Sequence, residues 1–224
     1  MQNSPARRVP SHGTDLMATT YAIDLVPVNG QGRSATERDW RSLLATEPPE
    51  RFLGFGAPVL APSKGRVVHV HDGEPDHAAR RSLPSLLPHV FGQAGRLRRG
   101  AAGLAGNHVV VQLGHGLGYV AVAHLQRGSI RVREGDLVDP GTRLGACGNS
   151  GNSTEPHVHL QVMDGVDPMT ARGLPMAFSR FREHHQGSVR LVELGLPTEG
   201  AVIEPAGSST RSWTGTDRHG RGPS

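Results

Sequence analysis

The sequence predicts a mainly β protein, organised as a sandwich or a barrel. Short segments that alternate apolar and polar residues follow one another about every ten residues, with turn residues between them, which is typical of all-β folds. The 224 residues include 30 glycines and 17 prolines, a composition that favours tight turns over a helical bundle. Hydrophobic residues make up 36% of the chain, which suits one aliphatic core in a single domain.

The first predicted strand covers residues 21–26. Its alternation places Asp24 on the face opposite Ile23 and Leu25. A carboxylate in the middle of an apolar strand is costly to bury unless it is paired or bound to a metal. Asp24 is therefore a candidate functional residue. The other segments with the strand pattern are 58–62, 65–71, 108–113, 118–125, 129–132, 137–138 and 143–146.

We expect a flexible segment at residues 1–11, one domain at 12–202 and a disordered tail at 203–224, which is rich in Gly, Ser, Thr and Arg. Within the domain, residues 74–105 interrupt the strand pattern with a helix-like, proline-broken insertion that is basic. Two interpretations of this insertion stay open. The insertion flanks a groove, or it is a solvent-exposed helical segment, because runs of charged residues usually just face water.

The most informative stretch is residues 148–162, a Gly/Asn/Ser loop that ends at Pro156 and leads into a short alternating strand. Side chains two residues apart on a strand share a face, so His157, His159 and Gln161 are expected side by side. Two imidazoles held on rigid backbone suit a metal ligand beside a general base. The alternative is two polar residues on the solvent face of a half-buried strand.

Four motifs in order resemble those of the lysostaphin-type (LytM-like) zinc metalloendopeptidases, which cleave peptidoglycan. They are Gly106-Asn107-His108-Val109-Val110-Val111, Ala123-His124-Leu125, Gly135-Asp136-Leu137-Val138, and the 148–154 loop followed by His157-Val158-His159. The resemblance covers about residues 12–165, apart from the insertion. It implies an antiparallel β-sandwich with a short helical insertion and a site in a groove floored by the sheet. It also implies a zinc-dependent endopeptidase that hydrolyses stem or cross-bridge peptides of the bacterial cell wall.

The resemblance also implies roles for particular residues. Asp24 and His159 would be ligands of one catalytic Zn²⁺ ion. His157 would take a proton from the attacking water, and His124 would stabilise the developing oxyanion. Three nitrogen and oxygen ligands leave the fourth position of zinc open, which is the arrangement of catalytic sites.

The chain departs from the family at the remaining ligand, a histidine that normally stands four residues before the aspartate. That position is Thr20 here, and threonine cannot replace it. The nearest upstream histidine is His12, which we predict to be the third ligand because a metal site needs proximity in space and not a fixed spacing. The alternatives are Asp15, a weaker substitute, and a site that lacks this ligand.

Other functions stay open at this point. A family member that has lost catalysis would act as a cell-wall binding or regulatory module. A sugar-transport phosphocarrier of related architecture also uses paired histidines, but the Asn-Ser-Gly-Asn-Ser loop and Asp24 argue against it. His69-Val70-His71 lacks that loop and is interpreted as surface. Cys147, the single cysteine, is interpreted as a packed structural thiol and not as a peptidase nucleophile.

The net charge of +4 and the pI near 10.1 favour contact with anionic polymers, including cell-wall glycans. No basic run is interleaved with aromatic residues, so nucleic acid is not an expected partner. No segment approaches transmembrane length and the N-terminus shows no export signal, which predicts a cytoplasmic protein, whereas the family resemblance predicts an extracytoplasmic or cell-wall location. The sequence predicts neither the scissile bond nor the oligomeric state.

Overall fold

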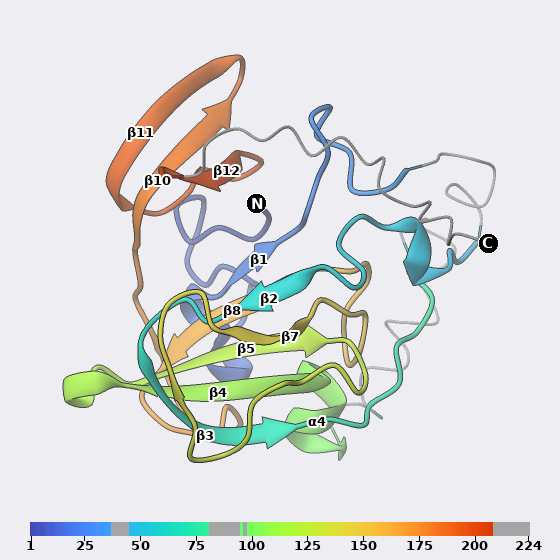
Figure 1. Cartoon of the computed structure of the whole chain (residues 1–224), viewed down its shortest axis with the longest axis vertical. Coiled ribbons are helices and arrows are strands. Elements are labelled where there is room, and N and C mark those ends of the chain that lie inside the picture. The colour runs from blue at the N-terminus through green and yellow to red at the C-terminus, as the bar shows by residue number, and fades with distance from the viewer. Residues whose placement is uncertain (37–44, 81–94, 96–97, 208–224) are drawn as a thin grey trace, which may run out of the picture.

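The computed structural model describes residues 1–36, 45–80, 95 and 98–207 (Figure 1). Its helical segments are η1 (Leu16–Tyr21), η2 (Pro49–Arg51), α4 (Gly100–Ala105) and η3 (Gly114–Gly116). Its strands are β1 (Ile23–Leu25), β2 (Pro58–Leu60), β3 (Gly65–His71), β4 (Asn107–Leu113), β5 (Tyr119–Leu125), β6 (Leu137–Val138), β7 (Arg143–Ala146), β8 (Val158–Met163), β9 (Gly173–Leu174), β10 (Phe178–His185), β11 (Ser188–Gly195) and β12 (Val202–Pro205).

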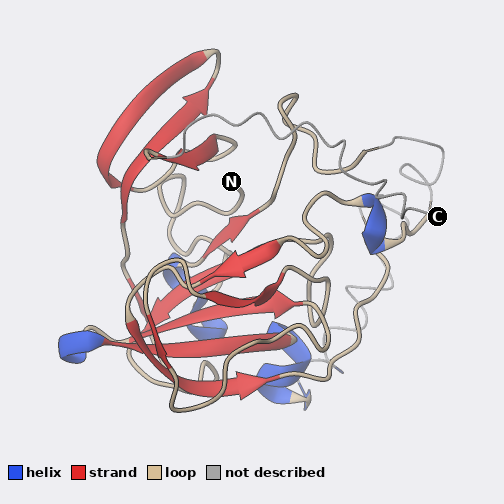
Figure 2. Cartoon of the chain, in the orientation of Figure 1, coloured by secondary structure: helices blue, strands red, loops and turns tan. Residues whose placement is uncertain are grey.

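The main sheet has seven strands in the order β1-β8-β5-β4-β3-β6, with β9 added beside β8. Each of these pairs is antiparallel. The antiparallel pair β2–β7 lies over one face, as Figure 1 shows. Apolar side chains fill the space between the two layers, among them Val59, Val111, Leu144 and Leu160. The prediction of a mainly β, antiparallel sandwich is thereby confirmed, and Figure 2 shows how little of the described chain is helical.

The other face of the main sheet carries the candidate site. A smaller apolar cluster lies on it, with Ala18 from η1 packed against Val110, Ala121 and Met163. Because strand side chains alternate, the strand that sends Leu160 into the main core sends His159 and its neighbours to this second face. The sandwich therefore leaves one sheet face available to form a groove.

A second, three-stranded sheet follows the main one in the chain, in the order β11-β10-β12 (Figure 1). None of the strand segments predicted from the sequence falls there. β10 and β11 are eight residues long each and pair antiparallel, but charged and exposed side chains occupy much of both strands. The apolar alternation that reveals a half-buried strand is therefore weak.

The N-terminal segment, for which the sequence predicts flexibility, has definite partners in the structure. Gln2 exchanges two backbone hydrogen bonds with Asp24, N to O at 3.0 Å in both directions. The Ser4 hydroxyl donates to the carbonyl of Pro197, and the backbone N–H of Ser4 donates to Glu199. These contacts place the first residues of the chain beside β1.

The structure describes part of the predicted insertion and tail. Within 74–105, α4 supplies a short helix, while residues 81–94 and 96–97 lie outside the described residues. Of the predicted tail, residues 203–205 belong to β12, and 208–224 lie outside the described residues. No helix in the described part of the chain is long and apolar enough to cross a membrane.

Candidate metal centre

Asp24, in the middle of β1, is the centre of the candidate site. Its neighbour Ile23 is buried in the main core, so Asp24 projects from the opposite face of the sheet, and its backbone lies opposite His159 in the β1–β8 register. The carboxylate is buried, with 6% of the residue exposed. Burial acts to raise the pKa of Asp24, but the charge of His157 and hydrogen bonds with His12, His157 and His159 hold it well below its usual value.

The two histidines of the His-x-His motif both lie within 3.5 Å of this carboxylate. His159, within β8, places its Nδ1 3.0 Å from Asp24 Oδ1. His157, just before β8, places its Nε2 3.5 Å from the same oxygen. Burial acts to lower the pKa of His157, but the charge of Asp24, the hydrogen bond with it and the backbone carbonyl of Glu155 raise the pKa above its usual value.

The third member of the group is His12, which reaches the site from an irregular loop ahead of η1. Its Nε2 lies 3.2 Å from Asp24 Oδ2. The ligand atoms of His12, Asp24 and His159 all lie within 4.8 Å of one another, a spacing that can hold a metal ion. Thr20 and Asp15 are not part of this group; the Thr20 hydroxyl donates to Asp15 Oδ1 at 2.8 Å.

His124 stands at the C-terminal end of β5 with a φ of 62°. This left-handed conformation is uncommon for a residue other than glycine and is often found at functional sites. Its Nδ1 lies 2.9 Å from the carbonyl oxygen of Ser150, and its ring centre lies 4.8 Å from that of His157 and 5.8 Å from that of His159. Burial, followed by the charges of His157 and His159, lowers the pKa of His124 well below its usual value.

The hydrogen bonds around His159 show whether the site fits a cation. The amide nitrogen of Gln161 donates to the carbonyl oxygen of Met17 at 2.8 Å, which turns the Gln161 Oε1 atom toward His159 Nε2 at 2.9 Å. Nε2 must then carry the proton, because Oε1 can only accept. In the neutral imidazole, Nδ1 therefore directs a lone pair at the Asp24 carboxylate. Two acceptors 3.0 Å apart require a proton or a metal cation between them, so the residues present fit a metal ion.

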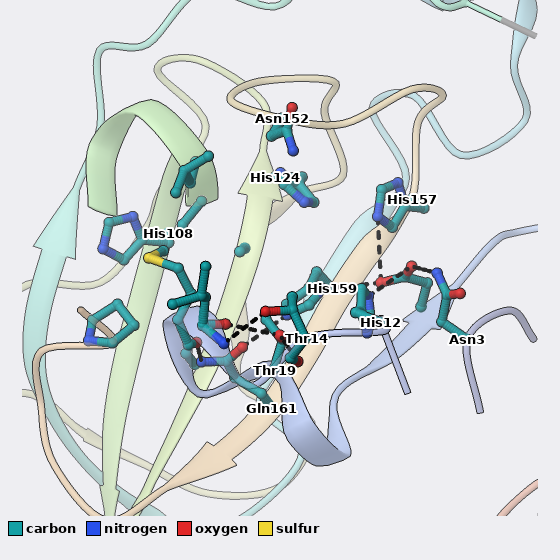
Figure 3. Close-up of a pocket in the computed structure, with 18 of the residues that line it drawn as sticks. Asn3, His12, Thr14, Thr19, His108, His124, Asn152, His157, His159 and Gln161 are labelled. Carbon is teal, nitrogen blue, oxygen red and sulfur yellow. Dashed lines mark hydrogen bonds and ion pairs between the residues drawn. The ribbon is translucent and has the colours of Figure 1, made fainter. Parts of the chain in front are cut away.

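A cavity of about 610 Å³ lies over these residues. Leu16 and Met17 of η1 and Leu104 and Ala105 of α4 line it together with the site residues. Figure 3 shows the labelled histidines of β5, β8 and the N-terminal loop around it. His12, Asp24, His124, His157 and His159, the five residues expected from the sequence, all line this one cavity.

Sequence analysis missed Asn3, whose side-chain nitrogen donates to Asp24 Oδ2 at 2.7 Å. It also gave Gln161 a place on the strand face but no function. The alternation of β8 contained the signal for Gln161, because a residue two positions after His159 shares its face of the strand. Asn3 gave no such signal, since it lies in a segment without periodic pattern. His69 and His71, interpreted as surface, have side chains 43% and 34% exposed.

Together, the mainly β fold and the His–Asp–His group beside two further histidines define a candidate metallopeptidase site. The comparisons with known proteins agree with this class. Residues 92–171 match the model of peptidase family M23. The peptidoglycan DD-endopeptidase ShyA of Vibrio cholerae is 39% identical over 77 residues, which are 34% of this chain and 17% of ShyA. The chain therefore aligns with only a small part of that relative.

Two solved structures are also similar. The catalytic domain of lysostaphin from Staphylococcus simulans has 24% identity, with 55% of this chain and 70% of that chain covered and a TM-score of 0.36. The catalytic domain of the prophage-encoded M23 protein EnpA from Enterococcus faecalis has 20% identity, with 68% and 88% covered and a TM-score of 0.37.

The resemblance to the lysostaphin-type peptidases is confirmed, because a segment of the chain matches the model of peptidase family M23 and is similar to a peptidoglycan endopeptidase. The matched segment contains His124, His157 and His159. It begins at residue 92 and so does not include the N-terminal residues of the site. Asp24 and His12 are brought to it by the fold. They are the two residues whose assignment depends most on geometry.

Proposed function

We propose that this chain is a zinc-dependent endopeptidase that hydrolyses peptide bonds in the stem or cross-bridge peptides of bacterial peptidoglycan. One observation carries the proposal: the ligand atoms of His12, Asp24 and His159 converge within 4.8 Å, beside the imidazoles of His124 and His157. The name of the relative ShyA, a peptidoglycan DD-endopeptidase, supports the substrate class.

Zinc suits this ligand set because imidazole nitrogen and carboxylate oxygen are both common zinc ligands. Three protein ligands leave a fourth position for water or substrate, as in catalytic zinc sites. When bound, zinc would lower the pKa of a water molecule towards neutrality and polarise the scissile carbonyl. His159 would bind through Nδ1 and His12 through Nε2, the nitrogens that face Asp24.

His124 and His157 would move the proton of the attacking water. His124 Nδ1 faces the carbonyl oxygen of Ser150, and His157 Nδ1 faces that of Glu155 at 2.8 Å. Carbonyl oxygens only accept, so each neutral ring holds its proton on Nδ1 and presents a bare Nε2. The sequence suggested His124 as a donor to the oxyanion, but a neutral His124 in this tautomer is an acceptor. The oxyanion donor is therefore whichever imidazole has first taken up a proton.

The cavity supports a peptide substrate over a highly charged one. Leu16, Met17, Leu104 and Ala105 provide apolar walls next to the polar centre. An apolar pocket with a few fixed polar groups is the usual form of a site that binds an uncharged segment of a ligand. The rival function is a family member without catalysis, which either lacks a zinc ligand or binds zinc without hydrolysing peptides. The convergence of His12, Asp24 and His159 argues against the first of these forms.

The test is the zinc content of the purified full-length protein, followed by digestion of purified peptidoglycan with release of new amino groups as the readout. We expect about one zinc per chain in wild type, a sharp loss in His12→Ala, and no loss in His184→Ala, which removes an exposed histidine of β10. A full equivalent in His12→Ala would refute His12 as a ligand. Wild type that takes up no zinc, even after loading, would refute the metallopeptidase. Zinc without hydrolysis would favour the binding module.

A further inference from the structure

The His12 loop has to be held by something other than strand geometry. In a strand, the backbone itself fixes where a side chain points, but His12 lies in irregular structure ahead of η1. The loop is closed at its base by Ser11, whose backbone N–H donates to the carbonyl oxygen of Thr20 at 2.9 Å. Thr20 stands where the family usually has its histidine, so this position contributes a backbone anchor in place of a ligand.

The Ser11 side chain makes two further hydrogen bonds. Its Oγ lies 3.0 Å from the carbonyl oxygen of Thr19 and 3.0 Å from Nδ1 of His12. A hydroxyl has one hydrogen to donate, and the carbonyl oxygen can only accept it. Toward His12, therefore, Oγ is the acceptor and Nδ1 carries the proton. Ser11 is fully buried, so water does not compete for either bond.

The consequence appears at the other nitrogen of the ring. With the proton on Nδ1, the neutral imidazole of His12 directs the lone pair of Nε2 at Asp24 Oδ2, 3.2 Å away. This is the tautomer that a metal ligand needs, because a metal binds the unprotonated nitrogen. Gln161 does the same for His159 from the opposite side of the carboxylate.

We propose that Ser11 is a positioning residue, which ties the His12 loop to Thr19 and Thr20 and fixes the tautomer in which His12 binds the metal. The proposal rests on the proposed function, since it assumes that His12 is a ligand. Ser11 thereby fixes the position of a histidine on a loop. For a histidine four residues before the aspartate, the spacing along the chain would fix that position instead.

The experiment measures zinc affinity in the full-length protein by competition with a chromophoric chelator, and the tautomer of His12 by ¹⁵N chemical shifts of the zinc-free protein. We expect Ser11→Ala to bind zinc about 10- to 100-fold more weakly, as loss of an outer hydrogen-bond partner usually does. The His12 ring should then show a mixture of tautomers. Ser11→Thr, which keeps the hydroxyl, should recover most of the affinity.

Ser129→Ala is the matched control, because it deletes a hydroxyl that accepts from the N–H of Ala146 at 3.0 Å, and Ser129 does not line the cavity. It should leave zinc affinity unchanged. If Ser11→Ala does not fold, Ser11→Cys gives the same comparison with a weakly hydrogen-bonding group of similar size. The proposal would be overturned if His12→Ala loses zinc but the Ser11 variant binds zinc as tightly as wild type and shows a single His12 tautomer. Full zinc in His12→Ala would instead overturn the ligand set, and this proposal with it.

Discussion

His108 should make the stability of the protein depend on pH between about 6.5 and 4. It is 2% exposed, its Nδ1 lies 2.8 Å from the carbonyl oxygen of Gly106, and its ring centre lies 5.3 Å from that of His69 and 5.6 Å from that of His71. Burial is the main cause that lowers the pKa of His108 from 6.5 to about 4; the Gly106 carbonyl opposes this, and the two histidines add to it.

The sign and size follow from proton linkage. Below pH 6.5 the unfolded chain binds a proton at His108, whereas the folded protein does so only near pH 4. The stability contributed by the neutral imidazole is therefore complete above pH 6.5 and is lost as the pH falls to 4. A difference of 2.5 pKa units (6.5 minus 4) corresponds to about 3 kcal/mol of unfolding free energy at 1.36 kcal/mol per unit.

The assay is urea unfolding at pH 7 and pH 4.5 of wild type and His108→Asn, which keeps an N–H donor near Gly106 but does not titrate. Any packing defect of the variant is present at both pH values and cancels in the comparison. We expect wild type to lose about 2 to 3 kcal/mol more than the variant between the two pH values. His184→Asn, which replaces an exposed histidine, should behave like wild type. Equal losses in wild type and His108→Asn would show that burial does not hold this imidazole neutral.

Three further predictions concern other parts of the structure. Cys147 should resist iodoacetamide at pH 8 in the folded protein and react in urea, because burial raises the pKa of its thiol to about 12. Fast labelling of the folded protein would contradict this. Gly106→Ala should lower the unfolding free energy in a urea titration by about 2 to 4 kcal/mol. The φ of Gly106 is 64°, and an added Cβ would lie 2.6 Å from the backbone of Ser150. An unchanged unfolding midpoint would refute this clash. Gln161→Leu should weaken zinc binding about tenfold or more in the chelator assay, and Gln161→Glu, which keeps an acceptor for His159, should weaken it less; equal affinities would exclude an orienting role.

The sequence predicted the parts of the site that depend on local geometry. The two-residue period of β8 put His159 and Gln161 on one face, and the same period in β1 separated Asp24 from the apolar core. His12 was found by a different route, as the nearest histidine to a position that lacked one. Its approach to Asp24 depends on a loop closed by hydrogen bonds from Ser11 to Thr19 and Thr20, and no periodic pattern encodes such a closure.

The N-terminal segment and the C-terminal sheet show why other features of the fold and the site could not be predicted from the sequence. Asn3 reaches the site because Gln2 pairs with the backbone of Asp24, an edge contact between segments with no shared motif. Strand β11 is mostly exposed, and β10 buries only Phe181 and Glu183 of its eight residues, so hydrophobic alternation, the signal that found the other strands, is weak in them. Pairing partners and exposed strands are fixed by tertiary structure.

The surroundings of Asp24 give a physical reason for a cation that is independent of family resemblance. Four nitrogens face its carboxylate: the amide of Asn3 at 2.7 Å, and ring nitrogens of His12, His157 and His159 at 3.2, 3.5 and 3.0 Å. The amide brings a hydrogen of its own. Each ring, when neutral, holds its proton on the far nitrogen, because that nitrogen faces an oxygen of Ser11, Glu155 or Gln161. A buried carboxylate surrounded by three lone pairs is unfavourable unless positive charge enters the group. Protonation of His157, whose pKa Asp24 raises, supplies one such charge, and a metal ion would supply it without displacing any of these outer hydrogen bonds.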